Sequence, residues 1–378
     1  MPELTLDTLE KISPVSRLLY SFLEPSQYEG TLLLVFLIFV ATLLVWCLYF
    51  LPLFSAISYM DVKFSADIQR RVGPNRVGPF GFFQILADTI KVFFKEDMAA
   101  TDSYADALTS VSKLGPLLSF SVLACALANI PFSKSILLTN LDVGVVWMFL
   151  YIIISTLLLV WSSVASSRVE TQISGYKLIQ SVFTFLAPLI IGLLPAVLTA
   201  GTLNLQQINL LQGGMPWQWG VFKDPGTLVA SVVVFVSLSI WERAAPFDFS
   251  INNTEFSGGI VLEMSGIRSS LLKMQSVLMR FLFASLFVSL YLGGWNTPFD
   301  LSFFGRASNL VEAIFFTTKV FGVLFFAIII KNSVPRVHIS QLVRFSWKFL
   351  VPGAVFSLFV SACWQILLRT ISGGGVNG

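Results

Sequence analysis

The sequence predicts an all-α integral membrane protein, and three observations support that fold class. Of the 378 residues, 55% are apolar and only 12% are charged, whereas a soluble domain is about 25% charged. The apolar residues gather in runs of about 20, the length of a helix that crosses a bilayer. These runs are too long for the strands of a membrane barrel, and helices satisfy their own backbone hydrogen bonds without water. This composition excludes most soluble enzymes and disulfide-stapled secreted modules.

About eight runs are the predicted membrane spans, because each is long enough for a helix across the hydrocarbon layer. They cover residues 30–60, 114–133, 143–167, 178–200, 225–241, 281–299, 310–330 and 349–368. The seventh run contains two charges, Glu312 and Lys319, which lie two helical turns apart on one face. Charges at membrane depth are costly and should face protein or water. These two residues either pair with neighbouring helices or belong to a proton path.

The remaining segments are predicted to lie at the membrane surfaces. Residues 1–29 lack the basic start and short apolar core of a signal peptide, which favours a short amphipathic surface segment. Apolar residues at helical spacing in 80–96 predict a second amphipathic helix, on the cytoplasmic face. We expect long ordered loops beside it, a single transmembrane domain over residues 30–369 and a flexible tail at 370–378.

Basic residues are divided unequally between the two sides of the predicted membrane domain. The connections 61–113, 168–177, 242–280 and 331–348 hold 17 Lys and Arg residues, whereas the other side, with both termini, holds 6. The positive-inside rule places the four basic connections in the cytoplasm or its equivalent. Both termini are therefore predicted on the opposite side of a multi-pass protein.

The scarcity of metal ligands constrains cofactor chemistry. The chain has one His and three Cys, whereas a structural zinc site or an iron–sulfur cluster takes about four ligands of these kinds. Cys47, Cys125 and Cys363 lie in different apolar runs without CxxC spacing, which is typical of small buried side chains. We predict no metal site and no cofactor bound by this chain alone. The net charge of +3 gives no indication of a nucleic-acid partner.

An arginine-rich turn follows the first predicted span. Arg70, Arg71 and Arg76 surround two Gly-Pro pairs, which stop the helix and fix two turns. The turn either anchors the chain by positive charge at the membrane surface or binds a polar headgroup or the carboxylates of a partner.

Two later connections also stand out. The connection 242–280 is long and rich in turn-forming residues, and such loops often carry function. The connection 331–348 contains His338, and a lone His at a membrane edge is more often structural than catalytic. The sequence contains no phosphate-binding loop, dinucleotide fingerprint or nucleophile elbow. The residues alone therefore indicate an eight-helix membrane protein with a structured cytoplasmic face.

Three motifs on the basic side, taken in order, resemble the signatures of one family. The first runs from Gln69 to Pro79 and continues with Gly81, Gln84, Asp88, Lys91 and Glu96. The second consists of Pro246, Phe247, Asp248, Glu255, Gly259, Glu263, Ser265 and Gly266. The third consists of Pro335, Arg336, Gln341, Arg344, Trp347, Lys348 and Pro352. The family resembled is that of the H subunit of bacterial NADH–quinone oxidoreductase, which includes subunit 1 of mitochondrial complex I and the equivalent subunit of the photosynthetic complex.

The resemblance implies both an architecture and a function. Members of this family have eight tilted transmembrane helices and form a quinone tunnel with hydrophilic partner subunits. The iron–sulfur clusters and any flavin lie in those partners, and the tunnel ends near a terminal iron–sulfur cluster. This chain is accordingly expected to be a subunit, not catalytic alone, of an NAD(P)H– or ferredoxin–quinone oxidoreductase that links quinone reduction to proton translocation.

The surroundings of the chain follow from the same resemblance. Its expected partners are the other membrane subunits, the hydrophilic quinone-site subunits with their terminal iron–sulfur subunit, lipid, and a quinone such as ubiquinone or plastoquinone. The membrane is expected to be a bacterial plasma membrane, a thylakoid or an organellar inner membrane.

The motifs and the charges within the spans assign roles to particular residues. Quinone binding is expected at Arg71, Phe247, Asp248, Glu263 and Arg268. Partner docking is expected at Arg70, Arg76, Arg336 and Arg344. Proton coupling is expected at Glu255, Glu263, Glu312 and Lys319.

The chain departs from the family pattern at several charged positions. Val62 stands where the family has a tunnel arginine, and uncharged residues stand at several positions where it has acids, among them Phe185, Ser276 and Ser340. Proton transfer needs groups that change charge. The departures therefore favour an alternative function, a structural membrane anchor for a hydrogenase-like or ferredoxin-linked module with lost or altered proton coupling.

Overall fold

Every regular element in the described part of the chain is a helix. The computed structural model describes residues 52–96, 106–166, 168–248, 259–299 and 307–371, apart from the side chains of 106–112, 262 and 263. Six of the described helices are long and apolar enough to cross a membrane, which confirms the predicted fold class. They are α6 (Gly144–Val164), α7 (Val169–Ala200), α9 (Pro225–Glu242), α10 (Gly266–Tyr291), α11 (Ser308–Ser333) and a continuous helix, Ile339–Ile371.

These six helices correspond to six of the predicted spans. A further span, predicted at 114–133, corresponds to α5 (Asp106–Ala126) and a short 3₁₀ turn, whose apolar part Lys113–Asn129 is shorter than the six. Most of the first predicted span lies outside the described residues, which begin with a helical segment at 52–68. The surface segment predicted at 1–29 and most of the tail also lie outside them.

Several predicted span boundaries are wrong. Helix α7 begins at Val169 where the predicted span begins at 178, and the last continuous helix begins at Ile339 where the prediction has 349. The largest difference concerns α10. The lack of charge predicts a sixth span at 281–299, whereas α10 begins at Gly266 and ends at Tyr291. Arg268, Lys273 and Arg280 interrupt the apolar run without interrupting the helix, because charges at a helix end can face protein or the membrane surface. The later part of the connection predicted at 242–280 is therefore helical.

The ends of the central helices have identifiable local causes. Asp224 caps α9 by accepting a hydrogen bond from the Gly226 backbone N–H at 2.9 Å, and Pro225 occupies the first helical position. At the other end Arg243 takes a left-handed conformation with φ 56°, which turns the chain sharply away from the helix axis. Gly201 ends α7 in the same backbone conformation with φ 67°, where glycine carries no steric penalty.

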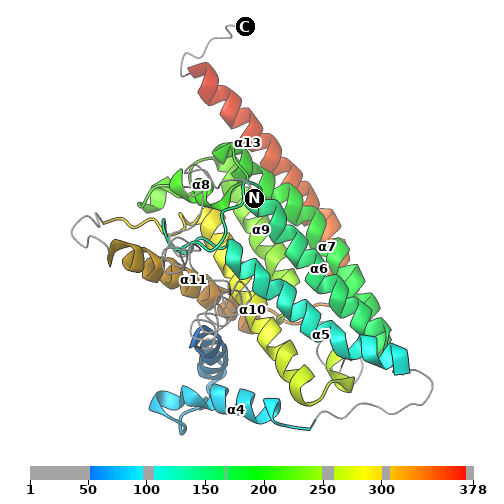
Figure 1. The fold of residues 1–378 in the computed structure, drawn as a ribbon. Coiled ribbons are helices and arrows are strands. Elements are labelled where there is room, and N and C mark those ends of the chain that lie inside the picture. Colours follow the sequence, from blue (N-terminus) through cyan, green and yellow to red (C-terminus); the bar gives the residue numbers. More distant parts are fainter. Residues whose placement is uncertain (1–51, 97–105, 167, 249–258, 300–306, 372–378) are drawn as a thin grey trace, which may run out of the picture.

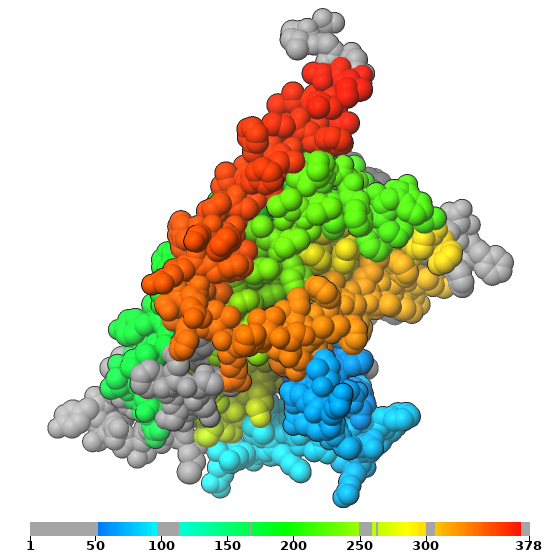
Figure 2. All heavy atoms as spheres, turned by 180° about the vertical axis from the view of Figure 1, so that it is seen from behind, coloured from blue at the N-terminus to red at the C-terminus, as the bar shows by residue number. Residues whose placement is uncertain are grey.

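Consecutive helices pack against one another to form the core of the domain. Helix α5 lies against α6, α6 against α7, and α7 against α9, while α10 contacts α5, α9 and α11. Helix α13 (Val351–Ile371) packs on α7 and α9 and extends beyond the other labelled helices (Figure 1). Figure 2 shows α13 and α11 along the opposite face, with residues 52–96 at one end. The core contains large buried side chains such as Trp241, Phe281 and Tyr291.

The arginine-rich turn and the amphipathic helix lie at the end of the molecule where α10 begins. Helix α4 (Phe83–Phe93) has no buried residue and lies against α10. The turn before it depends on Gly81, which has φ 83°, because a Cβ there would lie 2.3 Å from the Pro74 carbonyl. This close approach folds the two Gly-Pro pairs into one compact turn.

The continuous helix Ile339–Ile371 changes its winding near its start. Between α12 (Ile339–Phe345) and α13, residues Ser346–Leu350 form a π-helical turn. The buried Ser346 hydroxyl donates a hydrogen bond to the Thr184 carbonyl of α7 at 2.6 Å. This contact fixes the turn, which lies within the third motif, against the core.

Candidate functional site

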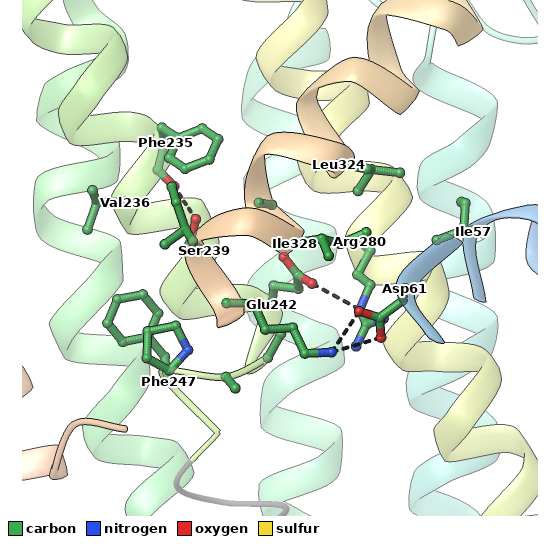
Figure 3. Close-up of a pocket in the computed structure, with 16 residues that line it drawn as sticks. Ile57, Asp61, Phe235, Val236, Ser239, Glu242, Phe247, Arg280, Leu324 and Ile328 are labelled. Atoms are coloured by element: carbon green, nitrogen blue, oxygen red, sulfur yellow. Dashed lines mark hydrogen bonds and ion pairs between the residues drawn. The ribbon is translucent and has the colours of Figure 1, made fainter. Parts of the chain in front are cut away.

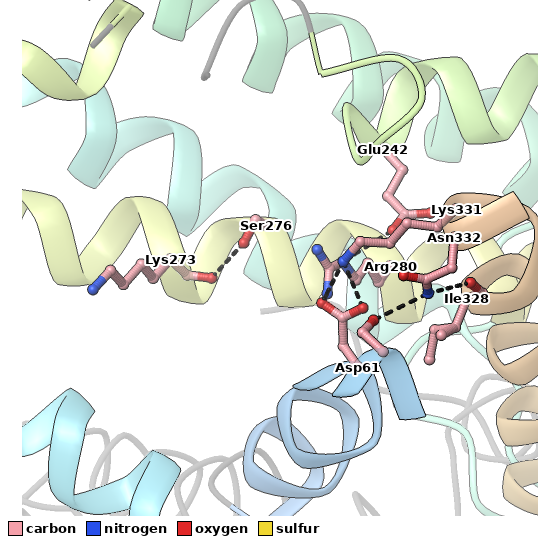
Figure 4. Close-up of polar contacts among 9 residues, drawn as sticks. Asp61, Glu242, Lys273, Ser276, Arg280, Ile328, Lys331 and Asn332 are labelled. Carbon is pink, nitrogen blue, oxygen red and sulfur yellow. Dashed lines mark hydrogen bonds and ion pairs between the residues drawn. The ribbon is translucent and has the colours of Figure 1, made fainter. Parts of the chain in front are cut away.

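Four charged side chains from four helical segments lie together in one cluster. They are Asp61 of the segment 52–68, Glu242 at the end of α9, Arg280 of α10 and Lys331 of α11 (Figure 4). We call this set the charge quartet. Its side chains are between 7% and 25% exposed. Two carboxylates and two cations thus balance each other in a mostly buried position.

Within the charge quartet, Asp61 is held more firmly than Glu242. One Asp61 oxygen lies 2.6 Å from Arg280 Nη1, and Lys331 Nζ lies 2.7 and 2.9 Å from the two Asp61 oxygens. Glu242 lies 2.9 Å from Arg280 Nε, but that N–H is not aligned for a hydrogen bond. Charge-assisted hydrogen bonds stabilise an ionised carboxylate. Three close contacts therefore stabilise the charge on Asp61, whereas a single poorly aligned contact stabilises the charge on Glu242.

A cavity of about 100 Å³ opens beside the charge quartet (Figure 3). One end carries all four quartet side chains. The other walls are apolar and come from Ile57, Phe235, Val236, Phe247, Leu324 and Ile328. A largely apolar pocket with a few convergent polar groups is the usual form of a binding site for a small molecule.

The turn after α9 forms part of the cavity wall and joins two of the motifs. Residues 244–247 line the cavity, and the Phe247 N–H donates to the Ala244 carbonyl at 2.8 Å. The neighbouring Asp248 is buried and lies 3.3 Å from Arg336 of the third motif. The Val337 N–H donates to the Pro246 carbonyl at 3.2 Å. The second and third motifs therefore meet beside the cavity, close to where Asp61 precedes the first.

The residues expected to bind quinone are separated in the structure. Phe247 lines the cavity, and Asp248 lies beside it in its pair with Arg336. Arg71 is exposed beyond the end of the segment 52–68 and does not line the cavity, whereas Arg268 is buried near the start of α10. Glu263 ends a short 3₁₀ turn, Gly259–Glu263, but its side chain lies outside the described part. A shared quinone-binding role for this set remains a prediction.

The residues expected in partner docking lie on the surface of the basic end. Arg70, Arg76 and Arg344 are exposed, and Arg336 is half exposed despite its contact with Asp248. The lone His338 is also exposed, at the start of α12. Their positions leave these side chains accessible to another protein, and docking itself remains a prediction.

Two residues expected in proton coupling, Glu312 and Lys319, contact groups outside the charge quartet. Glu312 accepts a hydrogen bond from the Lys134 backbone N–H at 3.0 Å. Lys319 donates to the carbonyls of Leu292, Gly294 and Asn296 at 2.9 to 3.1 Å. The two side chains therefore have separate partners, and Glu255 lies outside the described residues.

The charge quartet as a functional cluster was missed from the sequence, although a signal for it exists. Asp61, Glu242, Arg280 and Lys331 each stand directly beside one of four predicted apolar runs, at the end that faces the basic side. Four charges at the same depth on helices of one bundle have to pair or face water. Which helices are neighbours is not visible in the sequence, and so the pairing was not predicted.

The chain is similar to components of respiratory complexes along most of its length. It is 28% identical over 353 residues to the H subunit of NADH-quinone oxidoreductase from Carboxydothermus hydrogenoformans, covering 93% of this chain and 96% of that protein. It is 30% identical to the H subunit of the same enzyme from Bacillus thuringiensis subsp. konkukian, covering 82% of this chain and 91% of that protein.

A solved structure shares the fold. A chain of the membrane-bound sulfane sulfur reductase, an archaeal respiratory membrane complex, has a TM-score of 0.72 and 22% identity, covering 85% of this chain and 99% of that one. The family profile of NADH dehydrogenase matches residues 39–362. This chain is therefore a multi-pass membrane protein of the NADH dehydrogenase family.

Proposed function

We propose that this chain is the membrane subunit of a complex-I-like oxidoreductase that forms a quinone-access tunnel with hydrophilic partner subunits and links quinone reduction to proton translocation. The observation that carries the proposal is the cavity where apolar walls end at the charge quartet. An isoprenoid tail suits the apolar walls, and the carbonyl oxygens of a headgroup suit Arg280 and Lys331 as hydrogen-bond donors. The similarity to the two bacterial H subunits supports the same function.

The position of the motifs supports this proposal further. The turn 244–248 contributes Phe247 to the cavity wall and contacts the third motif through Asp248 and Arg336. The arginine-rich turn follows the segment that carries Asp61. A hydrophilic partner bound to the exposed arginines Arg70, Arg76 and Arg344 would thus sit close to the cavity. It would supply the two electrons that a quinone takes up from an iron–sulfur centre.

The charge quartet supplies a route by which reduction can be linked to a proton. A quinone that accepts two electrons also takes two protons to become a quinol, and the charge of the cavity changes until those protons arrive. Glu242 is the quartet carboxylate with the fewest supports for its charge. We therefore assign proton uptake to Glu242 and assign Asp61 the task of fixing Arg280 and Lys331 in place.

Glu242→Gln in the assembled complex tests this assignment. The amide keeps the size of the side chain but cannot exchange a proton, and general acid–base groups contribute on the order of 100-fold or more to rate. We expect quinone reduction to fall at least about tenfold, and proton uptake with it. Asp142→Asn is the matched control, because Asp142 is an exposed acid that does not line the cavity. Wild-type rates of both processes in Glu242→Gln would exclude the assigned role.

A second candidate function is the structural anchor of a hydrogenase-like or ferredoxin-linked module. It is favoured by Phe185, which fills the core with 1% exposure at a position where the family has an acid. A photoreactive quinone analogue separates the two candidates in the intact complex. Labelling of residues that line the cavity supports the tunnel. Labelling of other subunits alone, with none on this chain, supports the anchor.

A further inference from the structure

A second cavity, of about 180 Å³, shares Glu242 with the first as a lining residue. Its walls come from α9, the turn Gly259–Glu263, α6 and α10, and they are mostly apolar through Leu159, Ile260, Leu272 and Met279. Liquid water occupies about 30 Å³ per molecule, so the space exceeds that of a single ordered water. The second motif contributes the turn Gly259–Glu263 to its wall, but the proposed quinone tunnel runs through the first cavity and not through this one.

One wall of the second cavity carries a buried guanidinium that has no anionic partner among the described residues. Arg243 is only 4% exposed. Its Nε donates to the Trp241 carbonyl at 3.4 Å and its Nη2 lies 3.3 Å from the Met279 sulfur, a weak acceptor. Its Nη1 is buried and has no hydrogen-bond partner in the described part of the chain. Burial lowers the pKa of Arg243 to about 10, so the group stays charged at neutral pH.

The charges around Arg243 leave the cavity positive. Lys273 of α10 also lines it and is exposed. Glu242 is the one acid among the lining residues whose side chains are described, and it lies against Arg280. A buried cation is costly unless an opposite charge accompanies it. The cavity is therefore suited to an anion.

A buried amide adds a hydrogen-bond acceptor to the same wall. The Ser119 hydroxyl donates to the Ser155 carbonyl at 2.6 Å, so its oxygen can only accept from Gln275 Nε2, also at 2.6 Å. This chain of bonds fixes the rotation of the Gln275 amide. Its Oε1 is then left buried and has no hydrogen-bond partner among the described residues, and Gln275 lines the second cavity. A ligand that satisfies both Arg243 Nη1 and Gln275 Oε1 needs a hydrogen-bond donor as well as an anionic oxygen.

We propose that the second cavity binds a phosphate oxyanion that also carries a hydroxyl group. The anionic oxygens accept from Arg243 Nη1, and the hydroxyl donates to Gln275 Oε1. Two sources present this chemistry, free hydrogen phosphate and the headgroup of a hydroxyl-bearing acidic phospholipid such as phosphatidylglycerol. With the lipid, Leu159, Ile260 and Leu272 provide an apolar surface for the start of an acyl chain. The site is separate from the quinone tunnel, and it stands whether or not that function is correct.

The proposal is tested on the intact detergent-purified complex, as wild type and as Arg243→Met. Binding of radiolabelled inorganic phosphate is measured by equilibrium dialysis, and retained phosphatidylglycerol by native mass spectrometry. We expect about tenfold weaker binding of one of these probes in Arg243→Met, since a hydrogen bond to a charged group is lost. Arg369→Gln is the control, because it removes an exposed arginine that lines neither cavity and has no assigned docking role.

The two probes identify the source of the phosphate. Saturable dialysis binding assigns free phosphate, whereas retained lipid that inorganic phosphate does not displace assigns the headgroup. Wild-type complex is also heated with and without each probe, because a ligand of the folded state raises the unfolding temperature even if Arg243→Met fails to assemble. The proposal is overturned if neither probe binds or stabilises the wild type. It is overturned equally if a partner's carboxylate fills the cavity in a structure of the complex.

Discussion

Helix α11 carries two buried or half-buried lysines that are stabilised in different ways. Lys331 lies near the end of the helix and contacts both oxygens of the Asp61 carboxylate. Lys319 donates to three backbone carbonyls at the end of α10 and also faces the rings of Trp219 and Phe315, each 4.9 Å away. One cation has a titratable partner, and the other has partners that cannot change charge.

This difference divides α11 into two functional halves. In the charge quartet, a proton on either carboxylate alters the balance of four charges at once, so the arrangement can respond to chemistry in the cavity. The carbonyls around Lys319 lie at the negative end of the α10 dipole and are already complemented by the cation. That half of α11 is therefore expected to hold helices together and to take no part in proton transfer.

Arg280→Met should have the largest effect, because it leaves two nearly buried carboxylates with only Lys331 to balance them. Removing one partner of a buried ion pair costs about 3–5 kcal/mol. We expect the unfolding temperature of the complex to fall steeply, or assembly to fail, as followed by thermal scans and native gels. Arg369→Met makes the same change at an exposed position to which no docking role is assigned, and it should leave both unaltered. An equal loss of assembly or of unfolding temperature in the two variants would mean that the charge quartet contributes no more to stability than an exposed arginine does.

Lys319→Met should have an intermediate effect and should change stability alone. The variant leaves three carbonyls without their charged donor, at a cost of about 2 kcal/mol. We expect a lower unfolding temperature, with quinone reduction per assembled complex within about twofold of wild type. If the assembled Lys319→Met complex translocates fewer protons per quinone reduced than wild type, Lys319 takes part in proton transfer and the contrast with Lys331 is wrong.

Glu312→Gln should have the smallest effect. The amide oxygen of Gln can still accept from the Lys134 backbone N–H, so stability should change by less than about 0.5 kcal/mol. Proton translocation should also match wild type if coupling runs through the charge quartet. The ratio of protons moved to quinone reduced, measured in proteoliposomes, checks this. A clear fall in that ratio would show that Glu312 relays protons despite its fixed contact.

The sequence was sufficient for the fold class and for most of the spans, because apolar run length reflects bilayer thickness directly. It misplaced the start of α10, since Arg268 and Lys273 break the apolar run without breaking the helix. It also gave no reason to group Asp61, Glu242, Arg280 and Lys331. Those four residues lie on separate segments, and their contact depends on which helix faces meet. The pairing of Asp248 with Arg336 was missed for the same reason, as the two were assigned to different roles.

The π-helical turn Ser346–Leu350 changes the angle about the helix axis between the faces of α12 and of α13. Each of its hydrogen bonds spans one residue more than an α-helical bond, so the turn holds a single extra residue relative to an unbroken α-helix. One residue corresponds to about 100° of rotation about the axis. The face of α12 that presents Arg344 is therefore oriented independently of the face of α13 that packs on α7 and α9. A change in this turn is therefore expected to reorient the predicted docking residue Arg344 while α13 keeps its packing on α7 and α9.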